Sequence, residues 1–519
     1  IKEAIIEHKL NRVVVASCSP RTHEAMFRET LAQAGLNKYL FEMANIRDQN
    51  SWVHQKEHEK ATQKAKDLVR GAVAKAALLE PMYQTKMGLT REALVVGGGA
   101  AGLNSALSIA ELGFPVHLLE REDYLGGNAH KIFSREKDVR AYVRDLVSKV
   151  EAHPLVTVHL KTVPKSSSGF VGNFETLCEG PEGEFTLKHG VTVLAAGGHA
   201  HQPKSYLYGE SKRVMLSLDM DELLATNDPV ISKPGHTFAF IQCVESREPD
   251  RPYCSKVCCT HSIESALTIL DRNPTATIYI LYRDVRTYGF REELYHEARS
   301  RGVRFIRYDT DSYPDVSDKG PDGKIRIIVN DHVIKRPLSI DADYLTLASG
   351  IDPTPMKEEI VEVFKGQLTA EGYLLEAHMK LRPVDLATEG QYLAGLAHYP
   401  KPLEETIAQA KASAARAVTI LAKPHIMVGG VIAVVQPEKC AVCCTCVRAC
   451  PVSVPKIVRN EEDAALRGHA FMEPAICQGC GVCVSECPGK AIKLQFFTDD
   501  QLLAKIEAMV EDKRAAQEA

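Results

Sequence analysis

A four-cysteine segment occurs twice near the end of this 519-residue chain and constrains its fold more than any other feature. The first copy, C-x2-C-x2-C-x3-C-P, begins at Cys440, and the second begins at Cys477 with the same spacing. Nine of the 15 cysteines lie in residues 440–487. Secreted disulfide proteins spread their cysteines through small, loop-rich folds, so tight repeats in a large chain favour metal or redox chemistry in a reducing compartment.

The repeat has the two-cluster pattern of bacterial ferredoxins, in which the fourth cysteine of each copy binds the other cluster. We therefore predict two [4Fe–4S] clusters. The ligands of the first would be Cys440, Cys443, Cys446 and Cys487. The ligands of the second would be Cys477, Cys480, Cys483 and Cys450. Cys444 is additional, and we expect it not to be a ligand.

A glycine-rich loop follows a short apolar strand at residues 93–96. Gly97, Gly99 and Gly102 fit G-x-G-x-x-G, and the next strand, residues 116–119, ends at Glu120. The glycines permit a tight turn, close approach of a pyrophosphate and close helix packing, and the carboxylate can bind ribose hydroxyls. The pattern predicts a dinucleotide site, with an ordinary glycine turn as the alternative. Its other candidate residues are Ala100, Ala101 and Arg121.

Three later segments favour FAD over NAD. Gly126, Gly127 and Asn128 resemble the double-glycine segment of two-domain flavoprotein reductases. Residues 191–198, with Ala196 and Gly197, resemble their second short motif, and residues 392–395, ending at Gly395, resemble the strand that closes over the flavin. Those reductases usually have an Asp after this last glycine, where Leu396 stands here.

A second nucleotide-type fold is expected at residues 230–345, but no G-x-G-x-x-G occurs there. Its first strand, residues 237–241, is followed by four cysteines spaced C-x10-C-x3-C-C: Cys243, Cys254, Cys258 and Cys259. We predict that they hold a [4Fe–4S] cluster in place of a pyridine nucleotide. A zinc site or buried structural thiols are the alternatives. Adjacent residues rarely both reach one cluster, so the choice between Cys258 and Cys259 stays open.

Five segments resemble the A subunit of heterodisulfide reductase: ASCSPRTHE (16–24), QCVESRE with PYCSKVCCTH (242–261), LYRDVRTYGFREELY (281–295), EAHMKLRPVD (376–385) and GLAH (395–398). The resemblance covers nearly the whole chain. It implies an α/β fold, with a thioredoxin-reductase-like FAD core, a C-terminal two-cluster ferredoxin domain and a small N-terminal α/β unit. It also implies a cytoplasmic complex in which a flavin divides electron pairs between a high- and a low-potential acceptor.

The family further implies partners: other subunits of such a complex, a hydrogenase or formate dehydrogenase module that supplies electrons, ferredoxin, and a second copy of the chain. His398 and Lys401 follow the strand that closes on the flavin, where a cation can tune its reduced form. Unlike some members, this chain has no extra ferredoxin motif within the flavin domain, since residues 128–190 carry only Cys178. Because it opens at Ile1, we expect it to lack the start of a longer protein.

We expect a partial N-terminal domain and linker helix at 1–88, a FAD domain at 89–425 with the second Rossmann-like domain inserted at 230–345, a ferredoxin domain at 430–497 and a final helix at 498–519. A formal net charge of -4 excludes a strongly basic nucleic-acid-binding protein. The longest apolar run at a domain joint, residues 426–435, is far shorter than the about 20 residues of a membrane span.

The leading functional hypothesis is a FAD- and iron–sulfur-containing electron-transfer subunit that bifurcates electrons. A non-bifurcating electron relay in another large anaerobic complex is the first alternative. The second is a self-contained NAD(P)H-dependent disulfide reductase. That enzyme needs a nicotinamide loop and usually a C-x-x-C pair beside the flavin, and this chain has neither.

Overall fold

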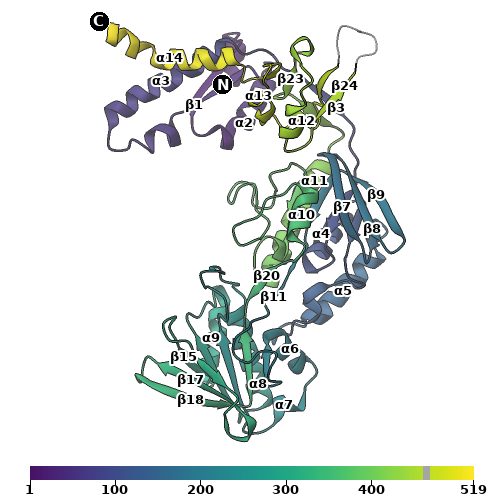
Figure 1. The fold of residues 1–519 in the computed structure, drawn as a ribbon, viewed down its shortest axis with the longest axis vertical. Coiled ribbons are helices and arrows are strands. Elements are labelled where there is room, and N and C mark those ends of the chain that lie inside the picture. Colours follow the sequence, from purple (N-terminus) through teal and green to yellow (C-terminus); the bar gives the residue numbers. More distant parts are fainter. Residues whose placement is uncertain (460–467, 519) are drawn as a thin grey trace. The chain divides into compact units, whose positions relative to one another are not determined.

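The computed structural model describes residues 1–459 and 468–518 (Figure 1). It contains two compact units. One combines Ile1–Gly88 with His425–Ala519, and the other is Leu89–Pro424.

The unit at residues 89–424 is built on two parallel sheets. The first has the strand order β21–β10–β4–β5–β6, all parallel. Its strands are β4 (Ala93–Val96), β5 (Val116–Leu119), β6 (Val156–His159), β10 (Val191–Leu194) and β21 (Gln391–Leu393). Every residue of β4 is buried, as expected for a strand with both faces covered.

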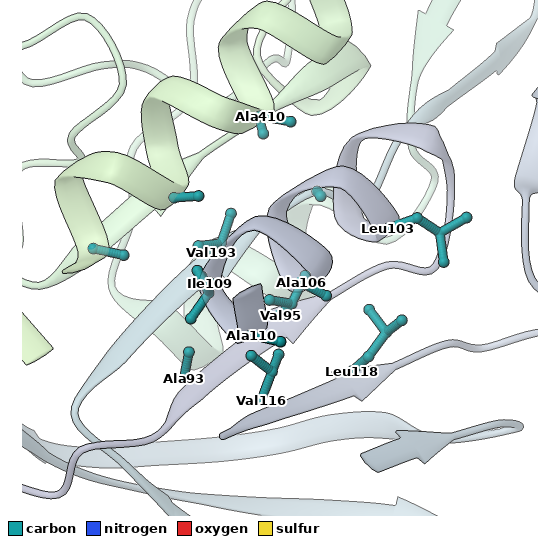
Figure 2. Packing of buried hydrophobic residues seen from close by; sticks show 14 of the residues in the cluster. Ala93, Val95, Leu103, Ala106, Ile109, Ala110, Val116, Leu118, Val193 and Ala410 are labelled. Carbon is teal, nitrogen blue, oxygen red and sulfur yellow. The ribbon is translucent and has the colours of Figure 1, made fainter. Parts of the chain in front are cut away.

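Helix α4 (Ala100–Glu111) packs between this sheet and α11 (Leu403–Leu421), as Figure 2 shows. The contact between the helices includes a hydrogen bond in which the Ser105 hydroxyl on α4 donates to the Ala410 carbonyl on α11 at 3.3 Å. Small side chains let the two helices approach closely, which fixes where the N-terminus of α4 lies above the sheet.

The second parallel sheet has the order β12–β19–β13–β14–β15. Its strands are β12 (Val214–Leu216), β13 (Thr237–Gln242), β14 (Thr277–Tyr282), β15 (Arg304–Arg307) and β19 (Tyr344–Ala348). Its helices are α6 (Ser217–Ala225), α7 (Pro229–Ser232), α8 (Cys258–Arg272), η3 (Gly289–Arg291) and α9 (Glu292–Ser300). Helix α8 begins at Cys258, so Cys258 and Cys259 lie in its first turn.

Two antiparallel three-stranded sheets and a two-stranded ribbon complete this unit. The sheets are β7 (Val163–Phe170), β8 (Asn173–Gly180) and β9 (Gly183–His189), and β16 (Asp315–Ser317), β17 (Ile325–Asp331) and β18 (Arg336–Ala342). The ribbon pairs β11 (Gly198–Ala200) with β20 (Ile351–Pro353) where the chain passes between the parallel sheets. Other helices are η2 (Gly127–His130), α5 (Val139–Ala152), η4 (Pro321–Gly323), α10 (Lys357–Phe364) and η5 (Gly395–Ala397).

This pair of parallel sheets confirms the predicted α/β fold of a two-domain reductase. One local prediction differs from the structure. The strand expected over residues 392–395 ends at Leu393, and the helix η5 begins at Gly395. Gly395 has a φ of +71°, which a continuing strand does not adopt.

The other unit joins the two ends of the chain. Its N-terminal elements are α1 (Lys2–Glu7), β1 (Val13–Ser17), α2 (Pro20–Gln33), β2 (Phe41–Asn45), η1 (Arg47–Ser51), α3 (His58–Ala77) and β3 (Gln84–Met87). Its C-terminal elements are β22 (Ile426–Gly429), β23 (Ala433–Val435), η6 (Pro437–Lys439), α12 (Thr445–Ala449), β24 (Pro455–Val458), β25 (His469–Met472), α13 (Val482–Ser485), β26 (Ile492–Leu494) and α14 (Asp499–Glu518). Strand β3 pairs with β22, and α14 lies along α3 (Figure 1).

A buried carboxylate ties α14 to the N-terminal elements. Lys75 Nζ on α3 donates to Glu42 Oε2 on β2 at 2.7 Å, and Lys505 Nζ on α14 donates to Glu42 Oε1 at 2.8 Å. Lys75 is only 2% exposed, and its ammonium also lies over the Phe496 ring. Burial lowers the pKa of Lys75, and the Glu42 carboxylate opposes that shift. Both lysines therefore depend on one acceptor.

Glu42→Ala should destabilise this unit by about 3–5 kcal/mol, because it leaves Lys75 buried without its anion. Trp52, the chain's only tryptophan, lies in this unit, so its fluorescence during urea unfolding reports on it selectively. Glu57→Ala breaks the exposed Lys60–Glu57 pair and should cost less than about 1 kcal/mol. Equal losses in the two variants would contradict the role given to Glu42.

Candidate functional site

The glycine loop between β4 and α4 forms one wall of the candidate site. A Cβ at Gly102 would lie 1.7 Å from the Gly97 carbonyl oxygen, and a Cβ at Gly97 would lie 2.4 Å from that of Ala195. A Cβ at Gly99 would meet nothing within 4 Å. The first and third glycines therefore permit close backbone packing, while the second faces open space at the N-terminus of α4. That space is the cradle that a pyrophosphate needs.

Glu120, at the end of β5, holds the loop in place. Its Oε2 accepts from the Gly98 amide at 2.6 Å, and its Oε1 accepts from the Glu122 amide at 2.8 Å. The neighbouring Arg121 donates from Nε to Glu122 Oε1 at 3.0 Å. The carboxylate thus lies where the fold would present it to a ribose.

A cavity of about 1410 Å³ opens over this loop. Of the residues predicted for the cofactor, it is lined by Gly97, Gly99, Ala100, Ala101, Glu120, Arg121, Gly127, Asn128, Ala196, Gly197 and Lys401. Gly102, Gly395 and His398 lie outside the lining. Leu396, which stands where related reductases have an Asp, lines the cavity. The open cradle at Gly99 and the size of the cavity fit a dinucleotide such as FAD.

The cavity also has a wall that the cofactor motifs did not predict. Tyr288, Phe290 and Arg291 line it, as does Glu404 at the start of α11. Tyr288 donates to Glu405, and Arg291 pairs with Glu404, so these contacts join η3 to α11. The only signal in the sequence is that Tyr288, Phe290 and Arg291 fall within the segment 281–295, which resembles the family.

The structure brings together the four cysteines of the second sheet. Cys243 follows β13, Cys254 lies in the next loop, and Cys258 and Cys259 open α8. Burial raises the pKa of Cys258 well above its ordinary value, and the thiols of Cys259, Cys243 and Cys254 raise it further. Within residues 1–459 and 468–518, no three His, Cys, Asp or Glu side chains converge tightly enough for a single metal ion. A four-iron cluster holds its thiolates further apart than one ion does, and the four soft donors suit it.

The loop that carries these cysteines has an uncommon backbone. Cys243, Glu245, Arg247 and Lys256 all have φ between +47° and +62°. Left-handed conformations at residues other than glycine cost free energy and gather at functional sites.

Ion pairs tie this loop to the β11–β20 ribbon. His201, next to β11, contacts Asp352 on β20 at 2.7 Å and Glu245 at 3.0 Å. Arg251 pairs with the same Asp352 at 2.9 Å. The cysteine loop is thereby anchored to the segment that leads back to the glycine-loop sheet, and Cys258 lines the same cavity as Gly99.

The ferredoxin-type cysteines form two groups in the other unit. Burial raises the pKa of Cys446, and so do the thiols of Cys440, Cys443 and Cys487. Burial raises the pKa of Cys483 to about 11, with contributions from Cys477, Cys450 and Cys480. Each group includes the fourth cysteine of the other repeat. Cys444 lies beside the first group, but its thiol donates to the Val442 carbonyl at 3.6 Å.

Lys401 and His398 lie beside η5. Lys401 Nζ donates to the carbonyls of Gly395 and Tyr399, at 2.6 and 2.8 Å. Burial, followed by repulsion from Lys256, lowers the pKa of Lys401 to about 7. His398 contacts Glu376 at 3.0 Å, and burial and Lys401 lower its pKa. Lys401 is therefore a lysine whose charge changes near neutral pH at the edge of the cavity.

Comparison with known proteins also finds a dinucleotide-binding domain and an iron–sulfur domain in this chain. A model of an NAD(P)-binding Rossmann-like domain matches residues 95–147, and a model of a 4Fe-4S dicluster domain matches residues 432–492. Thioredoxin reductase of T. acidophilum matches with a TM-score of 0.44 and 16% identity, over 64% of this chain and 98% of that one. The strand topology, and not this weak likeness, defines the fold.

Two curated relatives match almost the whole chain. The A-type subunit of the H(2):CoB-CoM heterodisulfide,ferredoxin reductase of Methanothermobacter thermautotrophicus is 33% identical, over 99% of this chain and 90% of that protein. The A-type iron-sulfur subunit of the CoB--CoM heterodisulfide reductase of Methanocaldococcus jannaschii is 31% identical, over 98% and 91%. The first alignment spans 608 positions against 519 residues here, so that relative carries segments that this chain lacks.

With this identity over this length, the chain belongs to the family of heterodisulfide reductase A subunits, as the sequence motifs indicated. It is an oxidoreductase of the electron-transfer type, built to carry a flavin and iron–sulfur clusters. No helix in the described part of the chain is both long and apolar enough to cross a membrane.

Gly99→Val should reduce FAD occupancy at least tenfold while leaving the fold intact. Its backbone, φ −76° and ψ −177°, accepts any residue, and the side chain would enter the cradle. Gly102→Val is the contrasting variant, because its side chain would collide with the Gly97 carbonyl and prevent folding of this unit. Flavin absorbance after gel filtration, with circular dichroism, separates the two effects. Full FAD content in Gly99→Val would contradict this assignment.

Proposed function

We propose that this chain is the flavin-based electron-bifurcating subunit of a heterodisulfide-reductase-type complex. One observation carries the proposal: a single cavity is lined both by the dinucleotide loop and by Cys258 of the four-cysteine set. Where a nicotinamide-dependent reductase has a glycine loop, this chain has thiols. An electron entering or leaving the flavin would therefore pass through this cysteine site.

In this proposal the glycine loop, Glu120 and Asn128 hold FAD, which would exchange electrons in pairs while the clusters exchange them singly. The amides at the start of α4 bind the pyrophosphate, and Glu120 binds the ribose. Asn128 Nδ2 already donates to the Gly198 carbonyl at 2.7 Å, which fixes the segment opposite the loop. Lys401 holds a proton at Nζ below pH 7 and can offset negative charge on the flavin.

We further propose three [4Fe–4S] clusters, which would give about 12 irons per chain. Two lie on the crossed cysteine groups of the ferredoxin repeat. The third lies on Cys243 and Cys254 with Cys258 or Cys259. The mutual electrostatic effect of these thiols and the left-handed loop around them support the third site.

The proposed partners follow from the family. The relatives' names mention H2, the CoB–CoM heterodisulfide and ferredoxin, and we propose for this chain partner subunits that reduce a disulfide, ferredoxin as a low-potential acceptor, and a hydrogenase or formate dehydrogenase module as donor. A second copy of the chain would complete a dimer. A non-bifurcating relay would use the same cofactors.

Anaerobic stopped-flow reduction of the purified complex tests the function. Flavin and cluster absorbance should change at separate rates, and a donor of intermediate potential should reduce ferredoxin only when the high-potential acceptor is present. Reduction of both acceptors independently of each other would favour the relay. Direct reduction of the flavin by micromolar NADH would overturn the proposal in favour of a self-contained reductase.

Cys254→Ala should remove about a third of the iron and one cluster's EPR signal, leaving both ferredoxin clusters in place. Flavin–cluster exchange should slow in the same variant. Cys178→Ala is the matched control, because Cys178 is fully buried in β8 and belongs to none of the three proposed cysteine groups. Retention of every cluster by Cys254→Ala would exclude the third site.

Lys401→Met should remove a break near pH 7 from the plot of flavin midpoint potential against pH. Below pH 7 the Lys401 ammonium stabilises negative charge on the flavin, and above pH 7 the neutral amine does not. The flavin midpoint potential of the unmodified protein should therefore fall more steeply with pH around pH 7 than it does in Lys401→Met. Lys411→Met, exposed on α11, should keep the break. An unchanged profile in Lys401→Met would exclude this role.

A further inference from the structure

The segment after β14 reaches the cysteine loop with charged side chains. Arg283 donates to the carbonyls of Ser246 and Arg247, each at 3.2 Å, and to Glu248 at 2.7 Å. It therefore holds the backbone that follows Cys243. This segment belongs to the family-like stretch at residues 281–295, for which the dinucleotide and cysteine motifs give no role.

Arg247 connects the two elements directly. Its Nη1 donates to the Cys243 sulfur at 3.8 Å, and its Nη2 pairs with Asp284 Oδ2 at 2.6 Å. The Arg247 side chain is 18% exposed, so solvent screens its charge only in part. Burial raises the pKa of Cys243, and the hydrogen bond and charge of Arg247 oppose that shift.

The same segment touches a second cysteine of the set. The Cys259 thiol donates to the Asp284 carbonyl at 3.6 Å. Burial raises the pKa of Cys259 to about 11, and the Arg286 backbone amide opposes the shift. Two of the four sulfurs are thus contacted by residues 247 and 284–286.

We propose that Arg247 raises the reduction potential of the cluster on the Cys243 set, and that Asp284 limits this effect by binding the same guanidinium. The proposal rests on the third cluster proposed above. Reduction adds one electron to the cluster, and a cation that donates to a ligand sulfur stabilises the more negative state. The Asp284 carboxylate acts in the opposite direction. Arg247 is therefore a tuning residue that makes this cluster a better electron acceptor.

The test is an anaerobic redox titration of the full chain, followed by EPR. At a fixed ambient potential, Arg247→Gln should change the oxidised-to-reduced ratio of this cluster roughly tenfold towards oxidised, a shift of about 59 mV for one electron. Asp284→Asn should shift the potential in the opposite direction. Arg247→Lys keeps the charge and should recover more than half of the shift. Arg326→Gln removes an equal charge from the Arg326–Asp341 pair on β17 and β18, away from the cysteines, and should change nothing.

A cluster that is present but unshifted in Arg247→Gln would overturn the tuning role. If Arg247→Gln fails to assemble the cluster, the other two variants decide. A raised cluster potential in Asp284→Asn together with a near-native potential in Arg247→Lys would support the tuning role. An unshifted potential in Asp284→Asn would overturn it. Failure of the site itself is distinguishable, because Cys254→Ala would then remove no EPR signal from the otherwise unmodified protein.

Discussion

Close contact between the Gly102 backbone and the Gly97 carbonyl is the constraint on which the unit at residues 89–424, here called the flavin unit, depends. It holds the first turn of α4 against the end of β4, so the free amides of the helix face the cavity. The hydrogen bond from Ser105 to the Ala410 carbonyl on α11 then fixes the helix from its other side. Because α11 also carries Glu404 and Glu405, the same packing places the acidic end of that helix at the cavity wall.

The second sheet repeats this architecture with different chemistry at the equivalent turn. In the first sheet, the space at Gly99 is open, and in the proposal above it would receive the pyrophosphate of FAD. In the second, Cys258 and Cys259 occupy the first turn of α8, where the helix dipole favours thiolates. Burying several thiols together raises their pKa values, so nearby cations and donors are needed to hold them ionised. Arg247 and the Arg286 amide meet that requirement at two of the four positions.

Much of the flavin unit could be predicted from the sequence because its signals are local. Strands β4 and β5 have the predicted bounds, since short apolar runs beside a glycine or a proline are strong patterns. The three-stranded sheet β7–β9 was not predicted, because its strands contain many serines, glycines and charges, as in Val163–Phe170. The pairing of β3 with β22 joins residues more than 300 positions apart, and no local pattern encodes that pairing.

The candidate site also contains residues that local sequence patterns predict and residues that they do not. Spacing alone predicted the glycines and the ferredoxin cysteines, because each ligand lies within a few residues of the next or in a repeated motif. Phe290, Glu404 and the Arg247–Asp284 pair reach the site only through tertiary contacts, and their sequence positions carry no spacing rule. Spacing therefore predicts which groups bind, whereas only the fold shows which charges surround them. Since surrounding charge sets the potential of a cluster, the direction of electron flow proposed for this chain would depend on the Arg247–Asp284 pair, which no spacing rule identifies.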